Sequence, residues 1–474
     1  MLFSSIIFIG CFLPAVLFIY YVLLRKRRLL QNYFLLLTSL MFYAWGEPRF
    51  VFILISSFTI NWLFGIWVDK YKNQKAKAKL IIVLMLIFNL SILFVVKYLM
   101  FTITNINALF GNSLTVPLIV LPIGISFYTF HAISYVIDVF RGRKAAQKNL
   151  LNLGLYISFF PQLIAGPIVR YDTIASQIMG RKESFDIFSA GVCRFIVGLA
   201  KKVLLANSFA AVVNMSFSIV QSGKLSVTFA WLGARAYALQ IYFDFSGYSD
   251  MAVGLGMMFG FKLPENFNYP YIAKSASEFW RRWHISLGMW FRDYVYFPLG
   301  GSRVSTRVRL AFNLFVVWFL TGVWHGANWT FMCWGLLYFV FITIEKITGF
   351  EKLAIPNVIK HLYTLLLILI GWVLFRSNTI ADAIQYLRVM FGFSSAMLVD
   401  AKTIVYCKEN LVYFGFGLLF SAPVAQAILR KAASLPSGKT AVSLLYTAVL
   451  TGMFILALAY LVKGTYNPFI YFNF

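Results

Sequence analysis

An uncharged, apolar run begins after Arg309 and ends before Glu345, and it constrains this chain more than any other feature. At about 1.5 Å per residue, a helix through the whole run is far longer than the roughly 30 Å hydrocarbon core of a bilayer. The run must therefore tilt, break or form two segments, and Gly322, Gly326 and Asn328 predict a break. Irregular backbone at membrane depth is stable only where protein shields it or where it lines a wet cavity. The run therefore predicts a cavity.

His325 lies at the predicted break, directly after Trp324. A histidine deep in an apolar segment is costly unless it has hydrogen-bonding partners or a task. We therefore expect His325 to face the cavity. The alternative interpretation is a hydrogen-bonded packing residue.

The composition indicates that the chain is embedded in a membrane. Of its 474 residues, 61% are hydrophobic and 12% are charged, and the mean hydropathy is +0.78. Ordinary soluble domains carry about 25% charged residues. Repeated apolar runs without strict alternation favour an all-α polytopic protein over a β-barrel.

The formal net charge of +26 has a simple origin. In a soluble chain it would suggest nucleic acid, but here Lys and Arg gather in short loops between apolar runs. The positive-inside rule and contact with anionic membrane lipids explain that pattern, so no nucleic-acid partner is expected. Some of these cations could also attract an anionic cytosolic substrate such as a coenzyme A thioester.

The basic loops predict the topology of the first five spans. Arg25–Arg28, Lys70–Lys79 and Arg141–Lys144 are cytoplasmic by the positive-inside rule, which leaves the N-terminus outside. The outer loop Thr102–Thr115 carries few charges. The spans that alternate around these loops are Phe3–Leu24, Tyr33–Trp45, Phe50–Val68, Leu80–Leu99 and a run from near Pro117 to Arg141.

The middle of the chain is less regular. Two prolines and a glutamine interrupt Leu150–Ile168, which fits a broken or re-entrant segment. In Ser275–Asp293, large apolar side chains including Trp283 share one helical face, and charged side chains including Arg282 lie largely on the other. This pattern predicts an amphipathic helix in the plane of the membrane interface.

Two or three later spans are predicted, at Val358–Phe375, Val412–Leu429 and Ala441–Val462. We expect about ten to twelve crossings in all, within a single domain of residues 1–474. The basic loop before the last span is cytoplasmic, so the aromatic tail at residues 463–474 lies at the outer surface.

Four histidines are the main candidates for chemistry. His131 is expected in the core and His361 on a solvated flank, whereas His284 and His325 are candidates for one cavity. There they could act as acid and base, or as metal ligands. The chain has no HxxxH or HExxH pair and no cysteine cluster, so acid–base chemistry is favoured and no metal is expected.

Asp244, Tyr248 and Asp250 form a polar insert within an apolar run. Carboxylates in a membrane span mark substrate paths or pair with buried cations. Arg235, Arg281 and Arg282 are candidate partners. A structural ion-pair network and a direct role in the chemistry both remain open.

Three ordered stretches carry a family resemblance: Gln240–Tyr271, Ser277–Arg303 (with FWRRWH) and Thr321–Tyr338 (with TGVWHGANW). They resemble the bacterial branch of the membrane-bound O-acyltransferases. The chain looks most similar to the membrane subunits of alginate and peptidoglycan O-acetylation, and less similar to the D-alanyl transfer protein of teichoic acid modification.

The resemblance implies a ring of tilted helices around a central tunnel in the bacterial inner membrane. An acetyl group would pass from cytosolic acetyl-CoA, a substrate and not a bound cofactor, to an extracytoplasmic partner with a serine nucleophile, for O-acetylation of a wall or extracellular polysaccharide. His325, in the WHG motif, is then expected to be catalytic, and His284 to lie in or near the tunnel. Further tunnel or substrate-binding candidates are Trp324, Asn328, Asp244, Tyr248, Asp250, Arg282 and Trp283.

The last six residues, FIYFNF, fit the FxYxxF ending of such acetyltransferases. The resemblance implies that Tyr471 accepts the acyl group transiently, with an aromatic membrane-interface anchor as the alternative. An unperturbed phenol has a pKa near 10, so His325 is expected to act as its general base. His284, Asn328 or a backbone N–H would stabilise the oxyanion, and the sequence does not choose among them.

Two other functions stay open at this point. A D-alanyl or other acyltransferase differs only in the donor and the width of the tunnel. A proton-coupled transporter also has intramembrane His and Asp residues and broken helices, although no inverted repeat is visible in the sequence.

Overall fold

The computed structural model describes residues 1–434, 438–464 and 470. These described residues form helices and loops without a strand, which confirms the all-α class. They divide into two compact units: Met1–Phe195 with Ser249–Pro264, and Ile196–Tyr248 with the described residues from Glu265 onward. The chain passes between the units three times: within α10 (Phe185–Ala200), within α12 (Val227–Met258) and between Pro264 and Glu265. The single domain of residues 1–474 stays a prediction.

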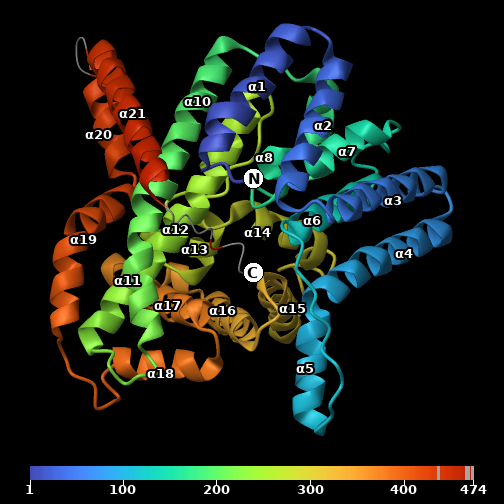
Figure 1. Ribbon diagram of the computed structural model, residues 1–474. Helices are drawn as coiled ribbons and strands as arrows, with labels where there is room; N and C mark the ends of the chain where they lie inside the picture. Colours follow the sequence, from blue (N-terminus) through green and yellow to red (C-terminus); the bar gives the residue numbers. More distant parts are fainter. Residues whose placement is uncertain (435–437, 465–469, 471–474) are drawn as a thin grey trace. The chain divides into compact units, whose positions relative to one another are not determined.

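The first unit contains α1 to α9 with parts of α10 and α12 (Figure 1). Short π-helical turns flank α1 and join α4 to α5. Between α3 and α4, which lie side by side, Asn61 and Asn89 exchange side-chain hydrogen bonds of 3.0 and 2.9 Å. The helices are α1 (Leu13–Phe18), α2 (Arg28–Gly46), α3 (Val51–Lys70), α4 (Lys75–Leu93), α5 (Leu99–Phe110), α6 (Ile125–Phe140), α7 (Leu150–Ser158), α8 (Phe160–Leu163) and α9 (Tyr171–Gly180).

The helical stretch Lys75–Phe110 is longer than the span predicted at Leu80–Leu99. Most of the predicted loop Thr102–Thr115 is helical, so that prediction was wrong. Its polar side chains fit a helix because they bond to carbonyls one turn earlier, as Thr102 does at 2.9 Å. Gly111 ends the helix in the left-handed conformation, with φ 66°.

The predicted interruption of Leu150–Ile168 is confirmed. Phe159 (φ −51°, ψ 114°) leaves the helical region between α7 and α8. Buried polar side chains satisfy the irregular backbone: Ser39 Oγ accepts a hydrogen bond from Phe160 N (3.0 Å), and Gln162 donates to a carbonyl of α7. The polar backbone groups at the break are therefore bonded within the protein, as irregular backbone in apolar surroundings requires.

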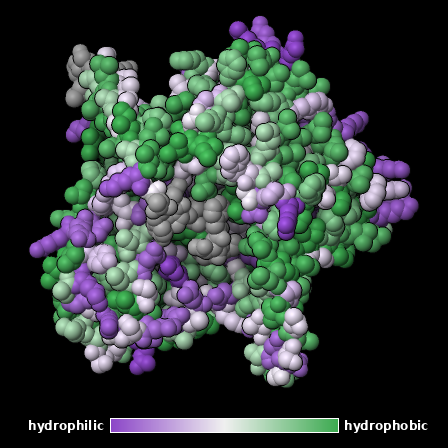
Figure 2. Space-filling model, viewed as in Figure 1, coloured by the Kyte–Doolittle hydropathy of each residue, from purple (hydrophilic) through white to green (hydrophobic). Residues whose placement is uncertain are grey.

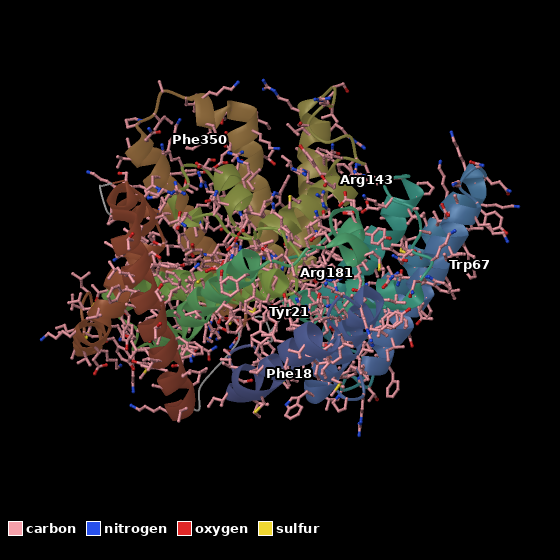
Figure 3. The ribbon with its side chains drawn as sticks, turned by 90° about the horizontal axis from the view of Figure 1, so that it is seen from above. Phe18, Tyr21, Trp67, Arg143, Arg181 and Phe350 are labelled. Carbon is pink, nitrogen blue, oxygen red and sulfur yellow. The ribbon has the colours of Figure 1, made fainter. Side chains whose placement is uncertain are left out.

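A cluster of polar groups joins the N-terminal helices of the first unit to the loop after α9. Glu183 accepts hydrogen bonds from Tyr20 (2.6 Å) and Arg28 (2.7 Å). Arg181, labelled in Figure 3, donates to Asn32 Oδ1 at 2.6 Å. Arg28 belongs to the predicted cytoplasmic loop, and its charge is balanced here within the protein.

The second unit contains the end of α10, a π-helical turn at Lys201–Ala206, α11, most of α12, and α13 to α21. Side chains of Ser275, Thr306, Asn328, Thr379 and Asp400 cap five of these helices by accepting a backbone N–H. The helices are α11 (Asn207–Ser218), α13 (Ala276–Arg282), α14 (Ile285–Phe291), α15 (Arg307–His325), α16 (Trp329–Thr348), α17 (Asn357–Arg376), α18 (Ile380–Met390), α19 (Ala401–Phe420), α20 (Val424–Ala433) and α21 (Gly438–Lys463).

The helices α15 and α16 form a tightly packed hairpin, side by side in Figure 1. Glycines make this packing possible. A Cβ on Gly322 would lie 2.5 Å from the carbonyl oxygen of Phe331, and one on Gly335 would lie 2.4 Å from that of Trp318. Small residues are what allow helix backbones to approach closely in membranes. The break predicted in the long uncharged run is confirmed and lies between these two helices.

The predicted span Val412–Leu429 is not one continuous helix, because α19 and α20 meet at 68°. Pro423 follows the end of α19, and proline cannot continue a helix at that point. Among the described residues, seven helices are long and apolar enough to cross a membrane, or eight if the bent pair counts as one span. This is fewer than the ten to twelve predicted, because Phe8–Leu23 and Ile125–Phe140 are shorter and other runs are interrupted.

Apolar side chains are exposed over large areas. Figure 2 shows hydrophobic residues over much of the visible face, with hydrophilic residues in separate patches. Phe18 and Trp67, labelled in Figure 3, are 57% and 45% exposed. Surfaces of this kind suit contact with lipid acyl chains.

Candidate active site

His325 is the last residue of α15, at the break before α16. The side chain of Asn328 fixes the chain after this break: its Oδ1 caps α16 by accepting from Thr330 N (3.1 Å), and its Nδ2 donates to Asn378 O, after α17 (2.9 Å). His325 is 4% exposed. The local fold therefore fixes the position of a buried imidazole at an interrupted helix.

Aromatic rings surround His325. Its ring centroid lies 5.0 Å from those of Trp324 and Trp334 and 5.2 Å from that of Phe375, each with an edge-to-face geometry. Such a box excludes water and strengthens electrostatic interactions inside it. An imidazole held there is suited to exchanging a proton with a substrate group.

His284 lies at a second break, between α13 and α14. Its backbone is left-handed (φ 44°, ψ 51°), and its side chain is buried at 2% exposure. It lies outside the membrane-spanning helices, and burial lowers the pKa of its imidazole from 6.5 to about 3. The ring is therefore neutral at pH 7 and carries one N–H donor.

One indole connects the two histidines. The Trp324 ring lies 5.0 Å from His325 and 6.0 Å from His284, measured between centroids. His284 also contacts Phe245 of α12, with the ring centroids 4.6 Å apart. The structure thus brings two helix breaks, distant in sequence, to the same aromatic side chain.

The interfacial helix predicted at Ser275–Asp293 was wrong. The segment is broken at His284, and most of its aromatic side chains are buried, Trp283 at 2% exposure. Trp280 packs on Trp334 of α16 (5.3 Å), and Trp283 packs on Trp372 of α17 (4.9 Å). The apolar face therefore packs against protein helices rather than against lipid.

Asp244 pairs with a residue that the sequence did not single out. Its carboxylate lies 2.6 Å from Lys202 Nζ, and both side chains are almost fully buried. Gly247, one turn further along α12, permits this approach, since a Cβ there would lie 2.7 Å from the carbonyl oxygen of Gly198. The only hint in the sequence was a lysine pair, Lys201 and Lys202, within an apolar run.

The three arginines predicted as partners of Asp244 interact with other residues. Arg281 pairs with Glu351 at 2.7 Å. Arg282 pairs with Glu278 at 2.9 Å, within the same helix. Arg235 stacks over Trp231 at 5.5 Å. The predicted pairing of Asp244 with these arginines was therefore wrong.

Asp250 and Tyr248 differ from Asp244 in their surroundings. Asp250 belongs to the first unit, where its Oδ1 accepts from Arg194 Nε (3.1 Å) and Nη2 (2.9 Å). This geometry supports the structural interpretation for Asp250. Tyr248 belongs to the second unit and is buried on α12 at 3% exposure.

The other oxygen of Asp244 contacts the end of the chain. Asp244 Oδ2 accepts a hydrogen bond of 2.8 Å from the backbone N–H of Ile470, which is 9% exposed. Phe245, the residue after Asp244, is the one that contacts His284. Tyr471, the predicted acyl acceptor, lies outside the described residues and follows Ile470 directly in sequence.

The remaining histidines are hydrogen-bonded. His131 is fully buried, as predicted, and its Nε2 accepts from Val169 N at 3.2 Å. His361 is half-buried, and its Nδ1 lies 2.9 Å from Ala273 O, so the prediction of a solvated flank was wrong. No three His, Cys, Asp or Glu side chains gather as metal ligands in the described part of the chain.

Glu345, near the end of α16, anchors the start of α13. It is 3% exposed and accepts hydrogen bonds from Ala276 N (2.7 Å), Ser277 N (2.9 Å) and Ser277 Oγ (2.8 Å). We predict that Glu345→Ala costs about 3 kcal/mol or more, because these buried donors lose a charged acceptor. The midpoint of thermal unfolding in detergent should fall by about 3–5 °C.

Glu351 provides the control, because it contacts the same helix from an exposed position. Its carboxylate pairs with Arg281 and accepts from Ser275 Oγ at 3.0 Å, with a side chain that is 50% exposed. Glu351→Ala should cost less than about 1 kcal/mol. Equal shifts for the two variants would contradict the anchoring role of Glu345.

Comparison with known proteins defines the class. The model of the MBOAT family, membrane-bound O-acyltransferase, matches residues 63–375. The chain belongs to this family and is a membrane acyltransferase, as the resemblance implied. The matched region contains His284, His325 and Asp244, whereas Tyr471 lies beyond it.

Individual relatives are similar over different lengths. The probable alginate O-acetylase AlgI of Pseudomonas putida is 37% identical over an alignment that covers the whole of both chains. The peptidoglycan O-acetyltransferase of Helicobacter pylori is 33% identical, over 84% of this chain and 81% of the relative. The teichoic acid D-alanyltransferase of Bacillus subtilis is 30% identical, over 48% of this chain and 60% of the relative.

Proposed function

We propose that this chain transfers an acetyl group from cytosolic acetyl-CoA to its own Tyr471, for O-acetylation of a cell-wall or extracellular polysaccharide. Two relatives named for alginate and peptidoglycan O-acetylation support the acetyl group and the class of acceptor. The D-alanyltransferase relative aligns with only 48% of the chain, so a D-alanyl donor is less well supported. Membership of an acyltransferase family favours an enzyme over a transporter.

The hydrogen bond between Ile470 and Asp244 carries the proposal. It connects Ile470, the residue before Tyr471, to Asp244 of α12. Phe245, the residue after Asp244, contacts His284. His284 in turn shares Trp324 with His325. Ile470 is thus linked to both histidines through Asp244, Phe245 and Trp324, all in one unit. An aromatic anchor in the membrane interface would not require a buried backbone contact of this kind.

The chemistry is a direct acyl transfer. His325 removes the proton from the Tyr471 phenol as the oxygen attacks the thioester carbonyl. The neutral His284 donates a hydrogen bond to the oxyanion. The C–S bond then breaks, and His325 returns the proton to the departing thiolate of coenzyme A. The products are acetyl-tyrosine and free coenzyme A, so atoms and protons balance.

The acetyl-tyrosine is an activated ester, because a phenol with a pKa near 10 is a far better leaving group than an aliphatic alcohol. A serine of an extracytoplasmic partner protein can therefore take the acetyl group from it, which returns Tyr471 to the free phenol. This assignment sets the chain in the bacterial inner membrane, with its basic loops toward the cytosolic donor and its tail outside.

The test is to follow a labelled acetyl group in membranes that contain the full chain. After a short reaction with labelled acetyl-CoA, base-labile label is expected on the C-terminal peptide. Ile470→Pro removes the N–H donor that Asp244 accepts, and a hydrogen bond to a charged group contributes about 1.5–3 kcal/mol. We therefore predict at least about tenfold less label on the tail in this variant.

Ile470→Val is the matched control, since it keeps the N–H and a β-branched side chain, and it should be labelled normally. Label that resides elsewhere in the chain would contradict the role of Tyr471. Equal labelling of the Pro and Val variants would contradict the contact with Asp244. Labelling from a D-alanyl thioester but not from acetyl-CoA would change the acyl group and leave the relay in place.

A further inference from the structure

The backbone around His284 has an unusual conformation. Its φ of 44° is in the left-handed region, which residues other than glycine rarely adopt. Such a conformation costs free energy and persists only where the surroundings over-determine it. Trp283, before it, is extended, and Ile285, after it, begins α14. Something outside these two short helices must therefore hold the break in place.

Asn266 makes three hydrogen bonds to the residues that directly follow His284. Its backbone carbonyl accepts from Ile285 N at 3.0 Å. Its side-chain Oδ1 accepts from Ser286 N at 3.2 Å and from Ser286 Oγ at 2.9 Å. Asn266 is 2% exposed, so these bonds form away from water.

The same loop also holds the residue two positions before His284. Asn268 N donates to Arg282 O at 2.9 Å, and Arg282 Nη1 donates back to Asn268 O at 3.2 Å. The loop segment Glu265–Asn268 is thus fixed to both sides of the break. Of its two asparagines, only Asn266 uses a side-chain atom in these bonds.

The direction of the His284 side chain depends on this backbone. A return to ordinary helical φ and ψ would join α13 to α14 and turn the imidazole to another direction. In the observed conformation the ring contacts both Phe245 and Trp324. The site therefore needs the break as well as the histidine.

We propose that Asn266 is a positioning residue for acyl transfer: its side-chain oxygen holds the left-handed break that directs His284 toward Trp324. This inference rests on the proposed function, in which His284 donates a hydrogen bond to the oxyanion. Asn266 itself touches neither the donor nor the acceptor in this role. It acts through the backbone of the residues after His284.

The test is a double-mutant cycle in cells that make the full chain in place of their own copy. Asn266→Leu keeps the size of the side chain and removes the acceptor. His284→Gly removes the imidazole and leaves a residue for which the left-handed backbone is unstrained. The measurement is the initial rate at which labelled acetate enters base-labile esters of the envelope polysaccharide, at equal amounts of membrane-inserted protein.

Asn266→Leu is expected to lower the rate about tenfold or more in the wild-type background. In the His284→Gly background the same change should have less than about a twofold effect, because residues that act as a unit are not additive. Asn266→Asp, which keeps an acceptor oxygen, should restore at least about a third of the wild-type rate. A general loss of structure would not produce this pattern.

Equal losses in the two backgrounds would overturn the positioning role and leave the role of His284 intact. A full rate in His284→Gly alone would instead remove the oxyanion role of His284, and this inference with it. If Asn266→Leu does not accumulate in the membrane, Ser286→Ala takes its place in the cycle. It removes one of the two bonds to the amide oxygen, and its effect should again disappear in the His284→Gly background.

Discussion

Replacing His325 with glutamine is expected to lower acetyl transfer by about 10²–10⁴-fold, the usual contribution of a general base. Glutamine fills much of the space inside the aromatic box but does not take up a proton at neutral pH. The loss should therefore appear in the rate while the protein inserts and folds normally. The measurement is the release of coenzyme A thiol from acetyl-CoA by membranes that contain the variant.

His361 supplies a control for this experiment. It is a half-buried histidine of the same unit, bonded to Ala273 O and without a place in the proposed relay. His361→Gln should change the rate by less than about threefold, since one hydrogen bond contributes about 1 kcal/mol to stability and nothing to the reaction. Normal thioester turnover by His325→Gln would remove His325 from its role as the base.

Tyr471→Phe is expected to reduce acetylation of the polysaccharide by at least about 10²-fold. The variant loses only the hydroxyl, so the aromatic character of the tail and the N–H of Ile470 are kept. In the proposed relay the acetyl group has no acceptor in the chain without this phenol, and loss of a nucleophile is among the most damaging changes to an enzyme. Ester-bound acetate released from the envelope by mild base measures the effect.

A second tyrosine tests whether any hydroxyl near the end of the chain suffices. Tyr460, on α21, is 45% exposed and lies 3.1 Å from the hydroxyl of Tyr413. Tyr460→Phe should leave acetylation unchanged, because this hydroxyl has no part in the proposed relay. Full acetylation in Tyr471→Phe would reduce the tail to a membrane anchor.

The break beside His325 was predictable because local sequence encodes it. Gly322, Gly326 and Asn328 interrupt an uncharged run that is too long for one span, and the structure divides the run there. The interruption near Phe159 was predictable for the same reason, since prolines mark it. In both segments the residues that weaken the helix lie within it.

The break at His284 could not be predicted from the residues of its own segment. The residues from Ser275 to Leu287 include neither glycine nor proline, and their periodicity fits one continuous amphipathic helix. The bonds that hold the break come from Asn266, on a different loop. Helix propensity and hydrophobic periodicity describe a segment by itself. They therefore cannot predict a conformation that hydrogen bonds from another part of the fold impose.

The partner of Asp244 escaped prediction for a related reason. A carboxylate in an apolar run predicts a cation, but the sequence offers several. Arg281 and Arg282 are paired with glutamates, and Lys202 meets Asp244 because a glycine on α12 lets the two backbones approach. Which cation meets a given carboxylate depends on packing between elements, and hydropathy carries no information about that.

The covalent link between α21 and Tyr471 sets a limit on the enzyme's working range. Helix α21 ends at Lys463, and a fully extended chain spans at most about 3.6 Å per residue. The Tyr471 backbone can therefore travel no further than about 29 Å from Lys463. If Tyr471 carries the acetyl group as proposed, so short a link could reach only an acceptor that docks within that distance of the end of α21. Delivery would then be selective by distance before any chemical recognition takes place.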